Sequence, residues 1–464
     1  MKPQKILRRL RRTSSLALIL GVGIAVVAAC SATSDPRNSG GAKQEALAGQ
    51  ASALTSSAVD PGVRGGPAGA GGPLAGLTQQ QLQAFQDGQQ DFNTEEGVPE
   101  GLGPRFNGTF CGQCHSQPAI GGTSPQTNPQ VAVATELGGQ NTVPSFVHLN
   151  GPIVEMHLLP SGSEPDLFVI TGRSDAPAAC AITQPAAVLN PPAGGYTLRI
   201  PSPLFGVGLM EAIKDSTILA GNLPAGAPSN ASLGITGHCN HAQDGTCGRS
   251  GWKAQFKTFQ LQTANAYNVE MGVTNLLFPT EREEDPACST GTRPEDKLRL
   301  ISSPTAIGAL AGLDDLNRFS NFQRFSAPPT PFNPGDGSFE YGQGKFISIG
   351  CANCHTPTLQ TGNFTFAALS NQPVNLYSDL LVHHLGTNLA DFPQVQAAAD
   401  EFRTAPLWGV GQRIFFLHDG RTTDIVDAIE EHSSTGSEAN QVIANFNNLS
   451  QSDQQAIVNF LRDL

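Results

Sequence analysis

CGQCH at residues 111–115 and CANCH at residues 351–355 are the two stretches on which the fold depends. In each, two thiols three positions apart are followed directly by an imidazole. On one helical turn, thiols at this spacing add across the two vinyl groups of a haem, and the next residue turns its imidazole toward the iron. A zinc site would need four further well-spaced ligands, and no second CxxC pair accompanies either motif. The predicted haem-binding residues are Cys111, Cys114, His115, Cys351, Cys354 and His355.

The first 30 residues have the pattern of an export signal. Residues 1–12 are basic, and residues 16–29 form an apolar run shorter than the roughly 20 residues that a bilayer-spanning helix needs. The run ends in Val-Ala-Ala-Cys, which resembles a bacterial lipobox, so we predict a signal peptide at 1–29 and a lipid on Cys30. Ser31 follows instead of the Asp that retains lipoproteins at the inner membrane, which favours anchoring at the outer membrane, facing the periplasm. The alternative is an ordinary cleaved signal with an unrelated Cys.

Composition divides the rest of the chain. Residues 30–77 are low-complexity Ser, Gly, Ala, Gln and Pro, which predicts a flexible tether. A hydrophobic fraction of 39% is enough for packed cores, although 51 Gly and 34 Pro indicate many turns and loops. With one haem motif in each half, we predict an N-terminal haem domain with insertions at 78–334 and a C-terminal haem domain at 335–464.

The charge of the chain argues against nucleic acid as a partner. Its formal net charge is −12, and removal of the basic leader changes this to −18. A protein of this charge repels phosphate and attracts basic partners by long-range electrostatics. We therefore expect a basic redox protein or cytochrome as the electron donor, and contact with the membrane only through the lipid anchor.

The two halves repeat around the haem motifs. Phe-x-x-Gly-x-x-x-Phe precedes each motif, at 85–92 and 339–346, with the Phe residues on one face of a helix. PLFGVG at 203–208 and PLWGVG at 406–411 follow in the same order, and residues 450–463 predict a closing helix with Ser450 as N-cap. We expect a mainly α protein of two cytochrome c-like domains, with loop-rich insertions and minor β structure.

Four cysteines remain outside the haem motifs and the lipid site: Cys180, Cys239, Cys247 and Cys288. An even number outside the cytosol suggests two disulfides. Cys239 with Cys247 closes a short loop and is the first expectation, and Cys180 with Cys288 follows by elimination. The alternative is a metal site formed by Cys239 and Cys247 with His238 and His241.

Several longer motifs together resemble the bacterial di-haem oxidoreductase family. They are GLGPRFNGTFCGQCH (101–115), GRSGWKA (248–254), FISIGCANCH (346–355), FRTAPLWGVG (402–411) and FLHDGRTTDIVDAIEEH (416–432). The resemblance covers roughly residues 78–464. Members of the family are labelled "thiol oxidoreductase" or peroxidase, and the family is similar to the di-haem cytochrome c peroxidases. The cysteines outside the haem motifs lack the C-x-x-C form, so they lend no support to a catalytic dithiol.

The resemblance implies roles for two residues of the N-terminal half. Asn268-Val269-Glu270-Met271-Gly272 resembles the N-x-E-M element of the peroxidases, whose Glu is the distal group that moves a proton between the peroxide oxygens. Trp252 resembles the Trp that relays electrons between the two haems. The alternatives are a surface or ion-paired carboxylate at Glu270 and a core side chain at Trp252.

For the C-terminal haem, the resemblance implies a distal ligand. His432 lies fourteen residues after His418, where the peroxidases have a Met and the maturation enzyme of methylamine dehydrogenase has a Tyr that ligates this haem. A His here would give bis-histidine ligation and a lower reduction potential. The alternative is a surface His on the amphipathic stretch 423–432. His418 is expected to hydrogen-bond near the haem rather than bind iron.

The sixth ligand of the N-terminal haem is not identified by the resemblance. The peroxidases place a His about sixteen residues after the proximal one, where this chain has Val131. The candidates are His148, Met156, His157 and Met210, or an empty position. By the same resemblance calcium could lie between the domains, although no ligand motif marks a site for it.

The implied function is redox chemistry at two c haems. Electrons from the donor enter at the C-terminal haem and pass to the N-terminal haem, where hydrogen peroxide or another small oxidant is reduced. The alternatives are a non-catalytic di-haem electron carrier and an enzyme that oxidises a protein or sulfur substrate. An open or displaceable position at the N-terminal haem would distinguish an enzyme from a carrier.

Overall fold

The computed structural model describes residues 58–464, apart from 283–284, 290–291 and 297–313. The predicted signal peptide at 1–29 and the predicted lipid site at Cys30 lie outside the described residues. Within those residues, no helix combines the length and the apolar character that crossing a bilayer requires.

Helices make up 31% of the structure and strands only 10%, which confirms a mainly α protein with minor β structure. The helices are α1 (Gln79–Phe92), α2 (Cys111–Cys114), α3 (Gln130–Val133), α4 (Ala186–Leu189), α5 (Val207–Ala212), α6 (Asp215–Ile218), α7 (Asn230–Leu233), α8 (Phe259–Met271), α9 (Asp315–Phe325), α10 (Ser338–Ile349), α11 (Ile425–Glu430), α12 (Asn440–Asn447) and α13 (Gln451–Asp463). Short 3₁₀ turns join several of them.

The strands form two-stranded antiparallel sheets, each too small to be a core of its own. The pairs are β1 (Arg105–Phe106) with β3 (Phe168–Val169), β2 (Glu155–Leu158) with β4 (Tyr196–Arg199), β5 (Leu359–Gln360) with β6 (Pro373–Val374), and β7 (Val382–His384) with β8 (Glu401–Arg403). In the longest pair, Glu155 lies opposite Arg199 and Leu158 opposite Tyr196. This pair matters below because it borders one of the two large cavities.

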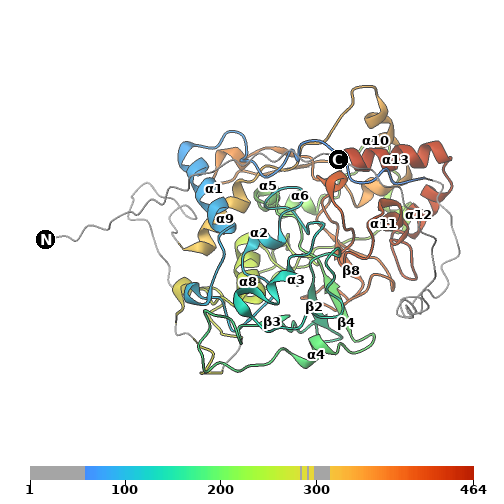
Figure 1. Cartoon of the computed structure of the whole chain (residues 1–464). Coiled ribbons are helices and arrows are strands. Elements are labelled where there is room, and N and C mark those ends of the chain that lie inside the picture. Colours follow the sequence, from blue (N-terminus) through green and yellow to red (C-terminus); the bar gives the residue numbers. More distant parts are fainter. Residues whose placement is uncertain (1–57, 283–284, 290–291, 297–313) are drawn as a thin grey trace, which may run out of the picture. The chain divides into compact units, whose positions relative to one another are not determined.

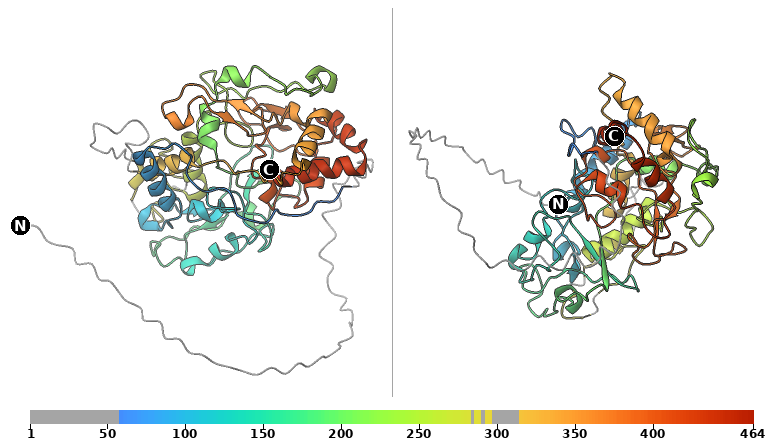
Figure 2. Two further views of the ribbon diagram at one scale, coloured as in Figure 1. Left: turned by 90° about the horizontal axis from the view of Figure 1, so that it is seen from above. Right: turned by 90° about the vertical axis from the view of Figure 1, so that its right-hand side faces the viewer.

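A pair of packed helices accompanies each haem motif. α1 packs on α9 in the N-terminal half, and α10 packs on α13 in the C-terminal half. Figures 1 and 2 show the first pair in blue and yellow and the second in orange and red. The N-cap of α1 is Thr78, which forms a capping box with Gln81. The N-cap of α13 is Ser450, as predicted, and its hydroxyl accepts the N–H of Asp453 at 3.2 Å.

Each helix pair comes into backbone contact at a glycine. A Cβ atom on Gly88 of α1 would collide with the carbonyl oxygen of Arg318 in α9. A Cβ atom on Gly342 of α10 would collide in the same way with that of Ala456 in α13. These are the glycines of the repeated Phe-x-x-Gly-x-x-x-Phe pattern, so the repeat seen in the sequence reflects a repeated helix contact.

A second glycine contact repeats as well. A Cβ atom on Gly208 would collide with the carbonyl oxygen of Arg324 near the end of α9, and one on Gly411 with that of Arg462 near the end of α13. These glycines belong to PLFGVG and PLWGVG. In each half, α9 or α13 therefore packs against two segments. One is the helix before the haem motif, and the other is the segment that contains PLFGVG or PLWGVG.

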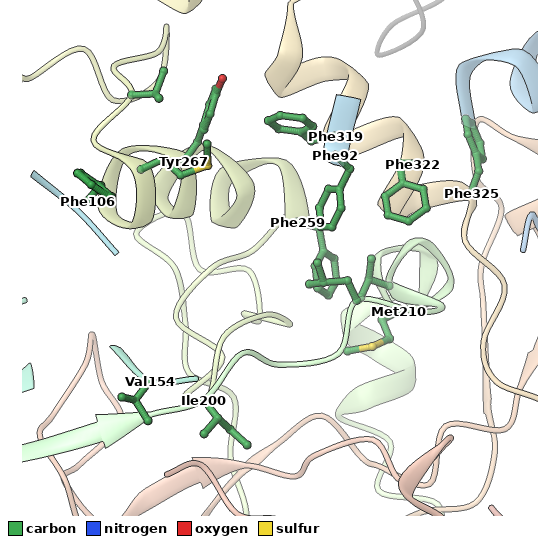
Figure 3. Packing of buried hydrophobic residues seen from close by; sticks show 14 of the residues in the cluster. Phe92, Phe106, Val154, Ile200, Met210, Phe259, Tyr267, Phe319, Phe322 and Phe325 are labelled. Atoms are coloured by element: carbon green, nitrogen blue, oxygen red, sulfur yellow. The ribbon is translucent and has the colours of Figure 1, made fainter. Parts of the chain in front are cut away.

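Aromatic side chains fill the space between the helices. Phe92 of α1 lies 4.9 Å from Phe322 and 6.0 Å from Phe319 of α9, measured between ring centroids, and Phe319 lies 5.2 Å from Tyr267 of α8 (Figure 3). In the C-terminal half, Phe346 of α10 lies 5.5 Å from Phe460 of α13. The N-terminal and C-terminal helix pairs thus belong to separate hydrophobic clusters.

Residues 58–77 do not hang free, although the sequence placed them in the tether. Asp60 forms a buried ion pair with Arg462 of α13 at 2.5 Å. The N–H of Arg64 donates to the carbonyl oxygen of Gly411, and that of Leu74 to the carbonyl oxygen of Phe325, both at 2.8 Å. Pro and Gly made this stretch resemble a linker, whereas its backbone hydrogen bonds attach it to both halves.

Both predicted disulfides are confirmed. Cys239 pairs with Cys247, and Cys180 pairs with Cys288. The alternative metal site has no thiolate ligands, because Cys239 and Cys247 are bonded to each other. His238 instead bonds to Glu401 at 2.7 Å, and Nδ1 of His241 donates to the carbonyl oxygen of Gly245 at 2.9 Å.

The glycine contact between α10 and α13 yields a matched pair of variants. Gly342→Ala should lower the free energy of unfolding by about 1–3 kcal/mol, because the new methyl group pushes the two backbones apart. Gly344→Ala lies on the same helix, where a Cβ atom meets nothing within 4 Å, and should be neutral or stabilising by up to about 1 kcal/mol. Urea unfolding of the haem-loaded protein measures both. Equal stabilities would contradict the contact.

Candidate functional site

Both haem motifs adopt the same tight helical turn. In each, the N–H of the His donates to the carbonyl oxygen of the first Cys, at 3.1 Å for His115 and 2.9 Å for His355. None of the four motif cysteines is in a disulfide. The two thiols and the imidazole of each motif line one cavity, a separate cavity for each motif.

Backbone hydrogen bonds orient the two motif imidazoles. Nδ1 of His115 donates to the carbonyl oxygen of Gly122, and Nδ1 of His355 to that of Tyr377, both at 3.0 Å. Because a carbonyl oxygen only accepts, Nδ1 carries the proton and Nε2 keeps the lone pair that an iron ligand needs. Burial lowers the pKa of His115 to about 4 and that of His355 to about 3, so both rings are neutral.

The four motif thiols are protonated at neutral pH. Burial is the main cause that raises the pKa of each one, to about 12 for Cys351. A catalytic dithiol needs at least one thiol of low pKa. The environment therefore suits thioether formation with a haem better than thiol redox chemistry.

The first motif borders a cavity of about 1260 Å³, a volume that includes space open to solvent. Trp252 and Glu270 also line it, so the structure brings both residues to the first haem motif. Glu270 lies at the C-terminal end of α8. Nδ2 of Asn107 donates to its Oε2 at 2.9 Å, and the N–H of Asn107 donates to its carbonyl oxygen at 2.7 Å. The loop before the motif thus fixes this carboxyl group.

The surroundings of Glu270 favour the protonated form of its carboxyl group. Burial is the main cause that raises its pKa well above the usual range, and the neighbouring Glu155 raises it further. The hydrogen bond from Asn107 acts in the opposite direction and is smaller than burial. A neutral carboxylic acid in a cavity can donate its proton to a bound molecule and later take one back.

One of the four candidates for a sixth ligand reaches the first cavity. His148 is exposed, and Met156 and Met210 lie in the hydrophobic core, outside the cavity lining that the structure describes. His157 lines the cavity. Its Nε2 lies 3.3 Å from Oε2 of Glu155 and its Nδ1 3.6 Å from Oε1 of Glu164, so two carboxyl groups lie beside the ring.

The second motif borders a cavity of about 1390 Å³ that also receives His418 and His432. His432 follows α11, and its Nδ1 donates to the carbonyl oxygen of Ala428 at 2.7 Å, which leaves a lone pair on Nε2. After burial, His432 is the next largest cause that lowers the pKa of His355. The two imidazoles therefore interact across one cavity, and His432 is not a surface residue.

Two buried arginines indicate what else the second cavity accommodates. Arg403 donates to the carbonyl oxygens of Gly251 and Thr404, and Arg413 to that of Pro406. Within the described residues, neither guanidinium forms an ion pair with a carboxylate. Burial lowers the pKa of each to about 10. Buried cations without a counter-charge are costly, and the two propionate groups of a haem would supply the missing anions. The second cavity therefore fits a haem by charge as well as by its thiols and imidazoles.

Trp252 lies at the boundary of the two cavities and lines both. Its Nε1 donates to the carbonyl oxygen of Ile200 at 3.1 Å, and the N–H of Ile200 donates to the carbonyl oxygen of His418 at 2.8 Å. The indole also meets the His418 ring edge-on, with centroids 6.5 Å apart. His418 in turn stacks on Phe402 at 4.5 Å. A packed and hydrogen-bonded chain of rings thus connects the cavities.

A buried lysine next to Trp252 fixes the boundary. Nζ of Lys253 lies 2.6–2.9 Å from three backbone carbonyl oxygens, those of Ala398, Ala399 and Glu401. Oδ1 of Asp391 lies 2.8 Å away, and the side chains of both residues are fully buried. Arg199 pairs with the other oxygen of Asp391 at 2.6 Å. This network ties the Trp252 loop to the segment before β8.

Sequence reasoning identified the motif residues but not the charges around them. Arg403 lies inside one of the quoted motifs, yet only the fold shows that its side chain enters the cavity. Glu155 and His157 alternate along β2, so they share one face of the strand, and this spacing was an available signal. Lys253 and Asp391 are far apart in the sequence, and no local pattern connects them.

Comparison with known families supports the same picture. The model of a family described as "Di-haem oxidoreductase, putative peroxidase" matches residues 192–464. The matched range includes Trp252, Glu270, His432 and the second haem motif, whereas the first motif precedes it. A comparison with curated proteins finds no match.

The network around Lys253 allows a test with an internal control. Lys253→Met leaves Asp391 and three carbonyl oxygens buried without their ammonium partner, and should cost about 3–5 kcal/mol of unfolding free energy. Lys257→Met removes an exposed ion pair with Asp244 and should cost less than about 1 kcal/mol. Urea unfolding at pH 7 compares the two, and similar losses would contradict the role of the network.

The same residue gives a pH dependence. Burial lowers the pKa of Lys253 to about 8 in the folded protein, against about 10.4 for an unfolded chain. Between these values the unfolded chain binds more protons, so Lys253 makes the unfolding free energy rise with pH there. This rise of the unfolding free energy, between about pH 8 and about pH 10.4, should be absent in Lys253→Met and present in Lys257→Met.

Proposed function

Since the chain belongs to the di-haem oxidoreductase family and its cofactors are haems, we propose that it is a c-type di-haem peroxidase of the cell envelope. Hydrogen peroxide is the proposed oxidant, and a small redox protein is the proposed electron donor. The difference between the two cavities carries this proposal. The second offers an imidazole, His432, to a proximal His, whereas the first offers a carboxyl group of raised pKa, Glu270.

We propose that each half is a cytochrome c-like domain. The repeated glycine contacts, the repeated thiol and imidazole turn and the closing helix α13 support this assignment. The ring of Phe92 lies 6.2 Å from His115, and that of Phe346 lies 6.3 Å from His355, so both imidazoles pack against an equivalent aromatic ring. The N-terminal half differs by a longer segment between its haem motif and PLFGVG, and this segment contains β2 and β4.

In this proposal Cys111 and Cys114 hold one haem through thioether bonds, and Cys351 and Cys354 hold the other. Nε2 of His115 and of His355 would be the proximal ligands, and Nε2 of His432 the distal ligand in the second cavity. When bound, the haems supply iron that accepts and releases single electrons. Arg403 and Arg413 would neutralise propionate groups in the second cavity.

Glu270 acts as the acid and base of the reaction. Reduction of one hydrogen peroxide to two waters consumes two electrons from the donor and two protons. The Glu270 carboxyl group, held by Asn107, can move a proton from one peroxide oxygen to the other and so favour cleavage of the bond between them. The raised pKa makes the Glu270 carboxylate a stronger base toward the first oxygen and favours the neutral form that then donates to the second.

We propose that electrons enter at the second cavity and leave at the first. Trp252 supports this route because it lines both cavities and is fixed by Ile200. The net charge of the chain favours a donor with a basic surface. Donor oxidation should then slow as salt is added, and a rate that is independent of ionic strength would contradict a basic donor.

For localisation we propose a lipid on Cys30 that anchors the protein at the outer membrane. Cys30→Ser should move the exported, haem-loaded protein from the membrane fraction to the soluble periplasmic fraction, because a lipidated N-terminus provides the anchor. Ser31→Ala is the matched control and should remain with the membrane. A Cys30→Ser protein that fractionates like the native one would contradict the lipid anchor.

Electron paramagnetic resonance of the half-reduced, haem-loaded protein tests the peroxidase. We expect a high-spin ferric signal that hydrogen peroxide consumes, because the first cavity presents a carboxyl group rather than a second free imidazole. Low-spin signals at both haems, indifferent to peroxide in every redox state, would contradict an enzyme and leave an electron carrier.

Glu270→Gln extends this experiment to the residue level. The spectrum before peroxide is added should persist, since the amide preserves the shape of the side chain. Peroxide consumption should fall by about 10²–10⁴-fold, the usual contribution of a general acid and base. Glu340→Gln, on the exposed face of α10, is the control with the same chemical change. Equal rates in both variants would exclude Glu270 from the reaction.

A further inference from the structure

A buried histidine borders the second cavity and has no part in the ligation described above. His383 lies in β7, and its side chain is 4% exposed. Its Nε2 lies 2.9 Å from Oδ2 of Asp379, and its Nδ1 lies 2.8 Å from Oε2 of Glu438. Because a carboxylate only accepts hydrogen bonds, both ring nitrogens donate, and the ring carries a positive charge between the two carboxylates.

One end of this cluster lies at the second haem motif. The N–H of Asp379 donates to the carbonyl oxygen of Cys354 at 2.9 Å, so the backbone of Asp379 is attached to the motif itself. Nδ1 of His383 lies 3.6 Å from Sγ of Cys354, and both side chains line the second cavity. The charged ring therefore packs against one of the two thiols that would bond to the haem.

The other end of the cluster lies on the segment that carries the distal imidazole. Glu438 follows His432 by six residues, and it lines the same cavity. The hydroxyl of Ser437 donates to the carbonyl oxygen of His432 at 2.6 Å, which folds residues 432–438 into a turn, here called the distal turn. His383 thus connects the end of the distal turn to the haem motif.

Glu438 is itself held as an anion. Its carboxylate accepts the N–H of Thr236 at 2.9 Å, the hydroxyl of Thr236 at 2.7 Å and the N–H of Gly237 at 3.3 Å. Burial acts to raise the pKa of Glu438, but the hydrogen bonds from His383 and Thr236 outweigh burial and lower this pKa to about 2. A Cβ atom on Gly237 would collide with the ring of His383, so the segment that holds Glu438 also packs directly on the imidazole.

The distal turn has further contacts that do not depend on the cluster. The N–H of Glu438 donates to the carbonyl oxygen of His384 at 2.9 Å, and the hydroxyl of Ser434 donates to that of Leu385 at 3.1 Å. Loss of the His383 ring should therefore shift the distal turn rather than release it. The two carboxylates of the cluster would repel each other without the cation that now lies between them, and this repulsion supplies the cause of the shift.

We propose that His383 is a positioning residue for the second haem, and that its ring between Asp379 and Glu438 sets the place of His432 relative to His355. The inference rests on the proposed ligation of that haem by His355 and His432. Nε2 of His432 can bind the iron only if it lies opposite Nε2 of His355, so a shift of the distal turn weakens or breaks that bond.

Electron paramagnetic resonance of the fully oxidised, haem-loaded protein tests this role without measuring turnover. His432→Ala identifies the low-spin ferric signal of the second haem by its loss. His383→Gln should lose most of the same signal and gain a high-spin one, because a neutral amide cannot replace the charge between two carboxylates. Added imidazole should restore the low-spin signal in both variants, because it can bind in place of the His432 ring.

His384→Gln is the matched control. It makes the same change at the next residue of β7, whose side chain is 44% exposed, and should keep the native spectrum. A merely structural role of His383 would change the stability of the protein and leave the ligation of its haem as it is. Loss of the low-spin signal in His383→Gln alone supports the proposal, and a native spectrum in His383→Gln overturns it.

The same samples separate this inference from the proposed function. If His432→Ala keeps the low-spin signal, the ligand assignment fails, and the role of His383 fails with it. If His432→Ala loses the signal and His383→Gln keeps it, only the role of His383 fails. Peroxide consumption is measured separately. A native protein that consumes none contradicts the peroxidase, and the spectra then decide the role of His383 by themselves.

Glu438→Gln keeps the proposal testable if His383→Gln does not take up haem. The amide preserves the shape of the side chain and removes one of the two charges that hold the His383 ring. The low-spin signal of the second haem should fall in this variant as well. A native spectrum in Glu438→Gln would overturn the role of the cluster.

Discussion

Two helices can bring their backbones into contact only where one of them lacks a side chain, and the haem motifs of this protein depend on that constraint. Gly88 and Gly342 allow α1 and α10 to lie against α9 and α13, and each pair then positions the turn that follows. In the C-terminal half that turn follows α10 directly, and in the N-terminal half a Cβ atom on Gly112 would collide with Asn93, so the turn lies against the end of α1. The same constraint explains why Phe residues flank each glycine: their rings fill the space on both sides of the contact.

On this shared frame the two halves differ in what they place opposite the proximal imidazole. The C-terminal half ends α11 so that His432 enters the cavity with a free lone pair, beside two arginines that form no ion pair with a carboxylate in the described part of the chain. The N-terminal half contributes α8 and the β2–β4 pair, and these carry carboxyl groups instead. A buried lysine or arginine is stabilised by a nearby anion, whereas burial favours the protonated form of a carboxyl group. The second cavity is thus suited to holding a charged cofactor tightly, and the first to moving protons.

Sequence patterns predicted the parts of this structure that depend on neighbours along the chain. The haem turns, the Ser450 cap and the Phe-Gly-Phe repeat all follow from local spacing, and the disulfides followed from counting cysteines. The sequence did not predict that residues 58–77 pack on the folded part of the chain. The partner of Asp60 is Arg462, which lies at the far end of the chain. Arg403, Arg413 and the Lys253–Asp391 pair were missed for the same reason. Their roles depend on burial and on partners that only the folded chain brings together.

The network at Lys253 explains why the boundary between the cavities can be both rigid and polar. A tryptophan that lines two cavities keeps one position only if its ring is fixed, and the indole of Trp252 makes one hydrogen bond in the described part of the chain, to Ile200. The adjacent Lys253 supplies the missing constraint, because its ammonium group is surrounded by four oxygens and packs 3.9 Å above the ring of Phe402. Phe402 stacks on His418, which meets Trp252 edge-on. The buried charge therefore orders the ring chain from both ends, and the carboxylate of Asp391 compensates it.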